Sequence, residues 1–188
     1  MTQRSPERAR SAEGTRAAIL EAARRVFTRD GYGVGLREVA AEADVNVALV
    51  IRYFGSKDEL FAAALGNELD LAPLLEGPRR ELGLRLARYA FGKPSSAHDP
   101  ILILLRSAGH EPALARFRQL VDERFVEPVS RWLGGEHAEV RAALIAGELI
   151  GIAMLRDVVR SDALRGADHE VRVMLAARAI QAHVTPKR

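Results

Sequence analysis

The sequence predicts an all-α protein with about nine helices, and three observations lead to this prediction. Apolar residues recur at spacings of three and four through most of the 188 residues, which is the period of one helix face. Residues that start or end helices divide the chain into segments of helical length. Lastly, no segment alternates apolar and polar residues between turn signals, as the strands of a hairpin would.

Composition limits the class of protein. Cysteine is absent, which excludes disulfides, cysteine zinc sites and thiol catalysis and suits a reducing compartment. The longest apolar stretch, from Ala142 to Leu155, is too short to cross a membrane and contains Glu148. The first residues lack the apolar core of a secretory signal. We therefore expect a soluble, cytoplasmic protein.

Positive charge is concentrated at the N-terminal end. Residues 1–29 contain seven arginines and three glutamates, a local charge of +4, whereas the whole chain carries +3. Such an asymmetry indicates a polyanionic partner. The alternative is a solvated basic arm in a protein that uses arginine everywhere, since lysine occurs only at Lys57, Lys93 and Lys187.

The first helix is expected from about Ser11 to Asp30. Its apolar face consists of Ile19, Leu20, Ala23, Val26 and Phe27. Asp30 and Gly31 supply a C-terminal signal. A second helix of about two turns follows Gly35. Its apolar face consists of Leu36, Val39, Ala40 and Ala43.

Residues 47–54, VALVIRYF, are rich in β-branched and aromatic side chains, which by propensity favour a buried strand. The flanking residues favour a helix instead. Asn46 is a good N-cap, and Gly55 is a helix-ending residue. The following residues 56–59, SKDE, are a capping box that starts another helix.

The connection between the two short helices is tight. Only three residues separate Ala43 from Val47, which is too few for a long loop. Asp44 is a residue type that tolerates a left-handed turn conformation. A short helix, a tight turn and another short helix have the spacing of a helix-turn-helix.

The rest of the chain also shows helical patterns. A fourth helix is expected to extend from residue 56 to Leu69 or Leu71, before Pro73. The stretch GKPSSAHDP, residues 92–100, has the composition of a loop. Further helices are expected over residues 81–91, 100–108, 111–128, 136–160 and 168–184, with a break at Gly134 and Gly135.

Residues Thr15 to Leu65 resemble the DNA-binding module of the TetR (tetracycline repressor) family of one-component transcriptional regulators. The resemblance lies in RAAILEAARRVFTRDGY, REVAAEADV and RYFGSKDELFAAAL, in the family's order. The remainder resembles, more weakly, the regulatory domains of actinobacterial members, through PILILLRSA and VRAALIAGELIGIAMLRDVV. Two domains are therefore expected: an arm with a helix-turn-helix DNA-binding domain over residues 1–60, and a helical-bundle ligand-binding and dimerisation domain over residues 61–188.

The resemblance implies a homodimer whose two helix-turn-helix modules enter successive major grooves of a palindromic operator on double-stranded DNA. A small-molecule effector bound in the larger domain would release the DNA, so the expected function is a ligand-responsive repressor. The alternative is a helix-turn-helix protein without an effector pocket, controlled by a protein partner or acting architecturally. A helical enzyme is a third class, but no catalytic, cofactor or metal site is expected. The histidines show no metal-ligand spacing, no glycine loop follows a strand, and no serine sits in a nucleophile elbow.

The resemblance also assigns DNA contacts residue by residue. The expected DNA-binding residues are Arg37, Asn46, Val47, Ala48, Leu49, Ile51, Arg52, Tyr53 and Lys57. Tyr53 and Lys57 match positions that hold the DNA backbone, and Lys57 follows a capping residue at a helix N-terminus, which favours anions. The apolar members can pack against thymine methyl groups but cannot identify guanine by hydrogen bonds. Arg37 is therefore expected to be the main polar reader.

The sequence departs from the family's pattern at three positions. Gly35 stands where a capping Thr or Ser is usual, and Ile51 replaces an aromatic residue. Asp44 replaces the usual turn glycine. Its negative charge close to DNA is expected to weaken nonspecific affinity.

Small residues recur every four positions at Ala143, Gly147 and Gly151, which lets another helix approach closely. This stripe is interpreted either as tight packing inside one subunit or as a dimer seam in a four-helix arrangement. Further candidates for the seam are Leu149, Val171, Leu175 and Arg178. The residues expected to face a core or pocket instead are Leu144, Glu148, Ile152, Leu155 and Val159.

Effector contacts are expected on the middle helices, where apolar walls are mixed with a few polar groups. The candidates are Tyr89, Leu102, Arg106, Phe117, Val121, Phe125, Glu148 and Ile152. Glu148 and Arg156 are charged residues among aliphatic ones, so each needs a partner. That partner is either another side chain or a ligand.

Overall fold

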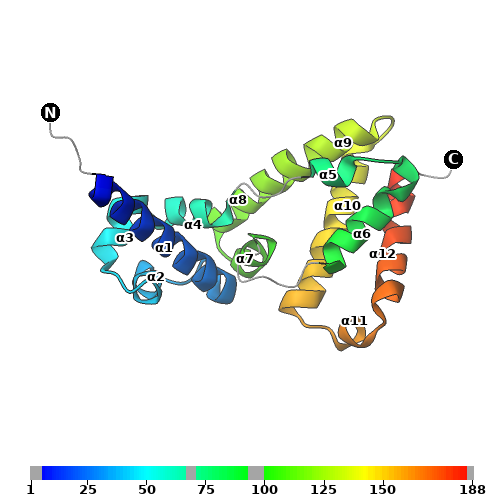
Figure 1. The fold of residues 1–188 in the computed structure, drawn as a ribbon. Coiled ribbons are helices and arrows are strands. Elements are labelled where there is room, and N and C mark those ends of the chain that lie inside the picture. The colour runs from blue at the N-terminus through cyan, green and yellow to red at the C-terminus, as the bar shows by residue number, and fades with distance from the viewer. Residues whose placement is uncertain (1–5, 67–70, 93–99, 186–188) are drawn as a thin grey trace. The chain divides into compact units, whose positions relative to one another are not determined.

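The structure, a computed structural model, describes residues 6–66, 71–92 and 100–185, and side chains from residue 12 onward. Every regular element within these ranges is helical (Figure 1). The all-α prediction is confirmed. The described part of the chain forms two compact units, one of residues 6–66 and 100–113 and the other of residues 71–92 and 114–185.

The two compact units do not follow the predicted domain boundary after residue 60. Residues 61–66 and 100–113 pack with the N-terminal helices. The division into a DNA-binding domain, 1–60, and a regulatory domain, 61–188, stays a prediction about function.

The first unit is built around a long central helix. Its elements are α1 (Pro6–Asp30), α2 (Leu36–Glu42), α3 (Val47–Phe54), α4 (Lys57–Leu65), α7 (Pro100–Ser107) and the first residues of α8 (Glu111–Val121). Helices α2, α4 and α7 all contact α1. Ile19, Val26 and Phe27 of α1 are fully buried. The Phe27 ring meets the Phe61 ring of α4 edge-on at 5.1 Å.

Two boundaries of this unit differ from the prediction. Helix α1 begins at Pro6 rather than near Ser11, because proline is compatible with the first turn of a helix; the side chains of the predicted arm, Arg4, Arg8 and Arg10, lie outside the described residues. Helix α4 ends at Leu65 rather than near Leu69, because Gly66 takes a positive φ of 63°.

The second unit consists of ten helical elements within the described ranges. They are α5 (Ala72–Leu75), η1 (Arg79–Glu81), α6 (Leu82–Gly92), most of α8, η2 (Asp122–Val126), α9 (Glu127–Leu133), α10 (Ala138–Ala153), η3 (Met154–Val158), α11 (Asp162–Gly166) and α12 (His169–Val184). The element η1 is a 3₁₀ helix, and η2 and η3 are π-helical turns. The short helices α5 and α11 were not predicted. The break at Gly134 is confirmed.

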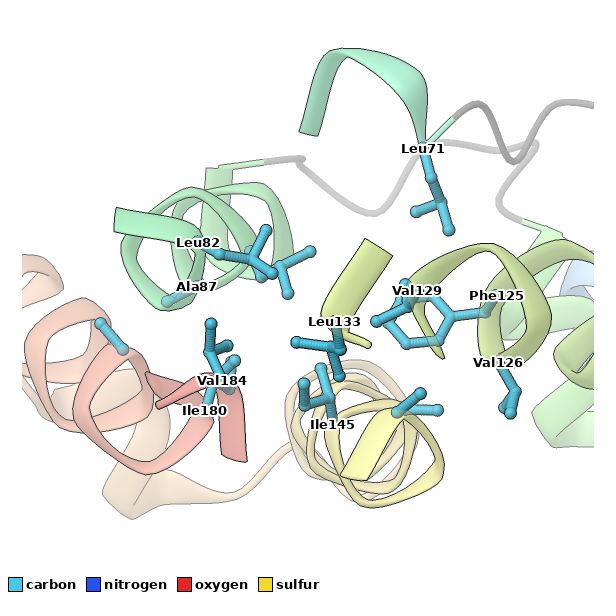
Figure 2. Close-up of a cluster of buried hydrophobic side chains, with 14 of the residues drawn as sticks. Leu71, Leu82, Ala87, Phe125, Val126, Val129, Leu133, Ile145, Ile180 and Val184 are labelled. Carbon is cyan, nitrogen blue, oxygen red and sulfur yellow. The ribbon is translucent and has the colours of Figure 1, made fainter. Parts of the chain in front are cut away.

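Four helical segments enclose the core of the second unit. Figure 2 shows side chains of α6, of the η2–α9 segment, of α10 and of α12 pointing into one cluster. Its fully buried members include Leu82, Val129, Ile145 and Ile180. Helices α6 and α12 approach closely at Gly83, whose N–H donates to Gln181 Oε1 at 2.9 Å. The predicted loop at residues 93–99 lies outside the described residues.

Candidate nucleic-acid interface

Helices α2 and α3 form the predicted helix-turn-helix. The N–H of Val45 donates to the carbonyl of Ala40 at 2.9 Å, which closes the turn directly behind α2. Asp44 takes the left-handed conformation, with φ of 52°. The sequence-based expectation for this residue is therefore confirmed.

The capping residues fix both ends of α3. Asn46 Oδ1 accepts a hydrogen bond from the N–H of Ala48 at 2.8 Å, and Gly55 ends the helix with φ of 76°. In the capping box that follows, Ser56 Oγ accepts from the Glu59 N–H at 3.1 Å while a Glu59 carboxylate oxygen accepts from the Ser56 N–H at 2.9 Å. These local bonds outweigh the strand propensity of VALVIRYF, so the predicted helix is confirmed.

Helix α3 buries one face and exposes the other. Val50 and Phe54 are 1% and 7% exposed and anchor the helix in the unit. Ile51 is 49% exposed although it is a large aliphatic residue. Ala48 and Arg52 are also exposed, and Val47, Leu49 and Tyr53 are half-buried. The outward face of α3 therefore consists of Ala48, Ile51 and Arg52.

Two arginines of the helix-turn-helix have no protein partner within the described part of the chain. Arg37 near the start of α2 and Arg52 in α3 are exposed, and neither makes a hydrogen bond or an ion pair to a described residue. The arginines of α1 differ from them. Arg25 is paired with Glu42 at 2.8 Å, and Arg24 with Glu21 at 2.9 Å. Part of the N-terminal positive charge is thus offset within the protein.

Lys57 begins α4 and stands over an aromatic ring. Its ammonium nitrogen lies 4.2 Å from the centroid of the Tyr32 ring. The Tyr32 hydroxyl donates a hydrogen bond to the carboxylate of Asp58. This hydrogen bond, together with burial and the negative charge of Asp58, raises the pKa of Tyr32 to about 12. Sequence reasoning quoted Tyr32 within RDGY but gave it no role.

Helix α7 holds the loop that carries Tyr32. Arg106 donates from Nη1 to the carbonyl of Arg29 at 2.9 Å and also to that of Thr28, at the C-terminal end of α1. The Tyr32 N–H donates to Ser107 Oγ at 2.8 Å. The guanidinium of Arg106 thus donates to carbonyls in the last turn of α1, and its predicted effector contact stays a prediction.

Two family models match the chain. Residues 80–184 match the tetracyclin repressor-like C-terminal domain, which alone is more than half of the 188 residues. Residues 19–64 match the bacterial regulatory proteins of the tetR family. The chain belongs to the TetR family. The resemblance found in the sequence is confirmed at both ends of the molecule.

Similar proteins agree with this assignment. The HTH-type transcriptional repressor SCO4008 of Streptomyces coelicolor is 47% identical over 66 residues, which are 34% of this chain and 34% of that protein. The match thus spans about a third of the relative's length. A solved TetR-family regulator, SCO0857 from Streptomyces coelicolor A3, is 29% identical with a TM-score of 0.58 over 97% of this chain and 99% of its own.

A second solved structure is the multidrug binding protein EbrR complexed with imidazole. It is 28% identical to this chain, with a TM-score of 0.61 over 98% of this chain and 93% of its own. TetR-family proteins are helix-turn-helix transcriptional regulators rather than enzymes. No helix in the described ranges is long and apolar enough to span a membrane. No group of three metal-binding side chains occurs there either.

The second unit of this TetR-family protein exposes an apolar face on α10 and α12. Of the predicted seam residues, Ala143, Gly147, Val171, Leu175 and Arg178 are exposed, and Leu149 and Gly151 are half-buried. A Cβ atom on either glycine would meet no described atom within 4 Å. These two glycines are therefore open to a further helix.

One prediction about the helix expected over residues 136–160 is wrong. Leu144, Leu155 and Val159 were expected to face a core or pocket, but they are 49%, 45% and 60% exposed. Residues 143 and 144 lie only about 100° apart around a helix. Leu144 therefore shares the exposed face with Gly147 instead of lying opposite it.

The remaining effector candidates are buried to different degrees. Leu102 and Phe125 are 5% and 6% exposed. The half-buried candidates are Tyr89, Arg106, Phe117, Val121, Glu148 and Ile152. Leu102 and Arg106 belong to the first compact unit, and the others belong to the second.

The two charged residues among aliphatic ones both have protein partners. A carboxylate oxygen of Glu148 lies 3.0 Å from His183 Nε2, which joins α10 to α12. Arg156 pairs with the buried carboxylate of Asp157 at 2.6 Å and donates to the carbonyl of Ala90. Both residues thus have the side-chain partners that were one alternative from the sequence, and the effector contact of Glu148 stays a prediction.

Proposed function

We propose that this TetR-family protein is a homodimeric repressor that binds a palindromic operator in the cytoplasm and releases it when a small molecule binds. The observation that carries the proposal is the outward face of α3. Ala48, Ile51 and Arg52 are exposed there, and neither Arg52 nor the exposed Arg37 of α2 has a partner among the described residues. Exposed aliphatic and arginine side chains on one helix-turn-helix suit a DNA groove, which offers both methyl groups and acceptor atoms.

Each proposed DNA contact has a chemical basis. Arg37 and Arg52 can donate paired hydrogen bonds to guanine or to phosphate. Ile51 can pack against thymine methyl groups. The half-buried members contribute from the edges of the helix and from the start of α4. They are Val47, Leu49, Tyr53 and Lys57. The exposed Asn46, whose side-chain oxygen caps α3, is a further proposed contact.

The proposed dimer forms through the exposed face of α10 and α12. An aliphatic face of this kind is uncommon on a monomer and is typical of an interface. The small residues at Ala143, Gly147 and Gly151 let the partner's helices approach closely. Leu149, Val171, Leu175 and Arg178 complete the proposed seam, to which Leu144 is now added by its exposure.

The proposed effector binding is supported by the similarity of this chain to a solved structure. EbrR, which aligns with nearly the whole chain, is described as a multidrug binding protein and was solved with imidazole. We expect a small organic molecule to bind among the middle helices. The proposed contacts stay those predicted from the sequence: Tyr89, Leu102, Arg106, Phe117, Val121, Phe125, Glu148 and Ile152.

Selection of bound DNA from a random pool tests the proposal, followed by binding measurements with and without a panel of small organic molecules. The expected result is a palindromic site bound by a dimer and released by at least one compound. A monomer at micromolar concentration, or selected sites without two-fold symmetry, would contradict it. A palindrome that no compound releases would favour the alternative regulator without an effector pocket.

A further inference from the structure

The loop between α1 and α2 touches the end of α7 so closely that only glycine fits. Gly31 has φ of +73°, and a Cβ atom there would lie 2.6 Å from the carbonyl oxygen of Arg106. The next residue, Tyr32, donates its N–H to Ser107 Oγ at 2.8 Å. Ser107 is fully buried, and its hydroxyl donates to the carbonyl of Ile103. The main chain of Tyr32 is therefore tied to α7.

Aromatic neighbours hold the ring of Tyr32 in place. The Phe61 ring meets it edge-on at 5.0 Å, and the His110 ring lies tilted at 5.6 Å. The ammonium of Lys57 stands over the ring at 4.2 Å. A cation at this distance from a ring face is attracted by the ring's quadrupole. Tyr32 thus limits the positions that the long Lys57 side chain can take.

The hydroxyl of Tyr32 contacts Asp58, the residue that follows Lys57. Asp58 is an exposed carboxylate in the first turn of α4, where a DNA phosphate would be repelled by its charge. Tyr32 donates a hydrogen bond to this carboxylate. Like any tyrosine hydroxyl, that of Tyr32 keeps its proton at neutral pH and so stays a donor.

We propose that Tyr32 is a positioning residue that holds Lys57 ready for the DNA backbone and makes this contact depend on the position of α7. The inference rests on the proposed function, because a phosphate contact of Lys57 is part of it. Holding a lysine side chain in advance reduces the rotamer entropy that is lost when it binds. Because Tyr32 contacts both Ser107 and Lys57, a movement of Ser107 would change the position of Tyr32 and therefore that of Lys57.

Two substitutions distinguish the role of the Tyr32 ring from that of its hydroxyl. Tyr32→Phe keeps the ring beneath Lys57, whereas Tyr32→Leu removes it. We expect Tyr32→Leu to lower affinity for the selected operator about 2- to 5-fold. We also expect it to reduce the slope of log affinity against log salt by about two, because each subunit of the dimer loses one phosphate contact. Tyr32→Phe is expected to keep the wild-type slope. A purely structural role would leave the slope of both variants unchanged.

A measurement without DNA keeps this inference separate from the proposed function. The chain has three lysines, so ¹³C-lysine labelling gives three ε-methylene signals, and Lys57→Arg identifies the one at issue. We expect ring-current shifts to move that signal upfield in the wild type and in Tyr32→Phe, but not in Tyr32→Leu. An unshifted Lys57 signal in the wild type would overturn the inference whether or not DNA binds.

The link to α7 is tested by Ser107→Ala, which removes the acceptor of the Tyr32 N–H. The Lys57 signal is expected to move toward the other two lysines, although residue 107 does not touch Lys57. Ile103→Val, another buried change in α7, is the matched control and is expected to leave the signal in place. An unchanged Lys57 signal in Ser107→Ala would refute the proposed dependence of Lys57 on α7. A shifted wild-type signal in a protein that selects no DNA would refute the proposed function and, with it, the DNA role of Tyr32.

Discussion

Two surfaces of this protein expose aliphatic side chains, and their surroundings differ. On α3, Ile51 is 49% exposed next to Arg52, and neither Arg52 nor Arg37 of α2 pairs with a described residue. On α10 and α12, Leu144 and Leu175 are 49% and 62% exposed beside small residues such as Gly147. Exposed aliphatic area alone does not identify a partner. The free cations suit a polyanion, and the small residues suit a second helix pair.

The largest effect is expected from placing a charge on the α10–α12 face. Leu175→Glu would bury a carboxylate in the proposed seam, so we expect a monomer at micromolar concentration and a loss of operator affinity of more than about 100-fold. Sedimentation velocity and fluorescence anisotropy measure the two effects. Ala115→Glu, at an exposed position of α8, is the control and should stay dimeric. If Leu175→Glu stays dimeric, the dimer does not form through the α10–α12 face.

A smaller effect is expected from removing the free arginine on α2. Arg37→Ala should cost about 1–3 kcal/mol of operator binding, because a paired hydrogen bond to a base is lost. Its dimerisation should not change. Arg25→Ala removes an arginine that is already paired with Glu42, and anisotropy should detect little loss for it. Equal losses for the two variants would mean that the lack of a partner does not mark the DNA-contacting arginines.

The apolar contact of α3 can be tested on the DNA side. Replacing thymine by uracil in the operator removes only a methyl group, which should weaken wild-type binding by about 1 kcal/mol or less, roughly one buried methyl. Ile51→Ala should be insensitive to that replacement and, being a surface change, should alter the free energy of unfolding by less than about 0.5 kcal/mol. Val50→Ala, a buried neighbour, should instead destabilise the fold. If Ile51→Ala keeps the full thymine preference, Ile51 does not read the methyl groups.

The smallest effect concerns pH. The raised pKa of Tyr32, about 12, means that the folded protein keeps this proton more tightly than the unfolded chain, whose tyrosines titrate near 10. The contribution to stability is therefore complete below about pH 10 and is lost as the pH rises through about 12. A tyrosinate absorbance titration of the three tyrosines should therefore show a separate last step near pH 12, which belongs to Tyr32. Tyr32→Phe should remove that last step, and its persistence would contradict the assignment.

Local signals in the sequence were sufficient for the helix-turn-helix. Asn46, Gly55 and the Ser56–Glu59 capping box act on residues no more than four positions away, so their effect can be predicted without knowing the fold. The same holds for Asp44, whose conformation follows from its residue type and the short turn.

The same local signals do not predict contacts between residues that are far apart in the sequence. Periodicity groups the residues of α10 into faces but does not tell which face is buried, and Leu144 was therefore assigned wrongly. Tyr32 was missed for a similar reason. Its partners Asp58 and Ser107 are 26 and 75 residues away in the sequence, and only the folded first unit brings them together.

The central claim is that the two exposed apolar surfaces serve different partners. Sedimentation of Ile51→Glu and Leu175→Glu with a labelled operator, followed at separate wavelengths for protein and DNA, tests it most directly. The account predicts that Ile51→Glu sediments as a dimer without DNA, whereas Leu175→Glu sediments as a monomer. A monomeric Ile51→Glu protein, or a Leu175→Glu dimer that still binds the operator, would contradict it.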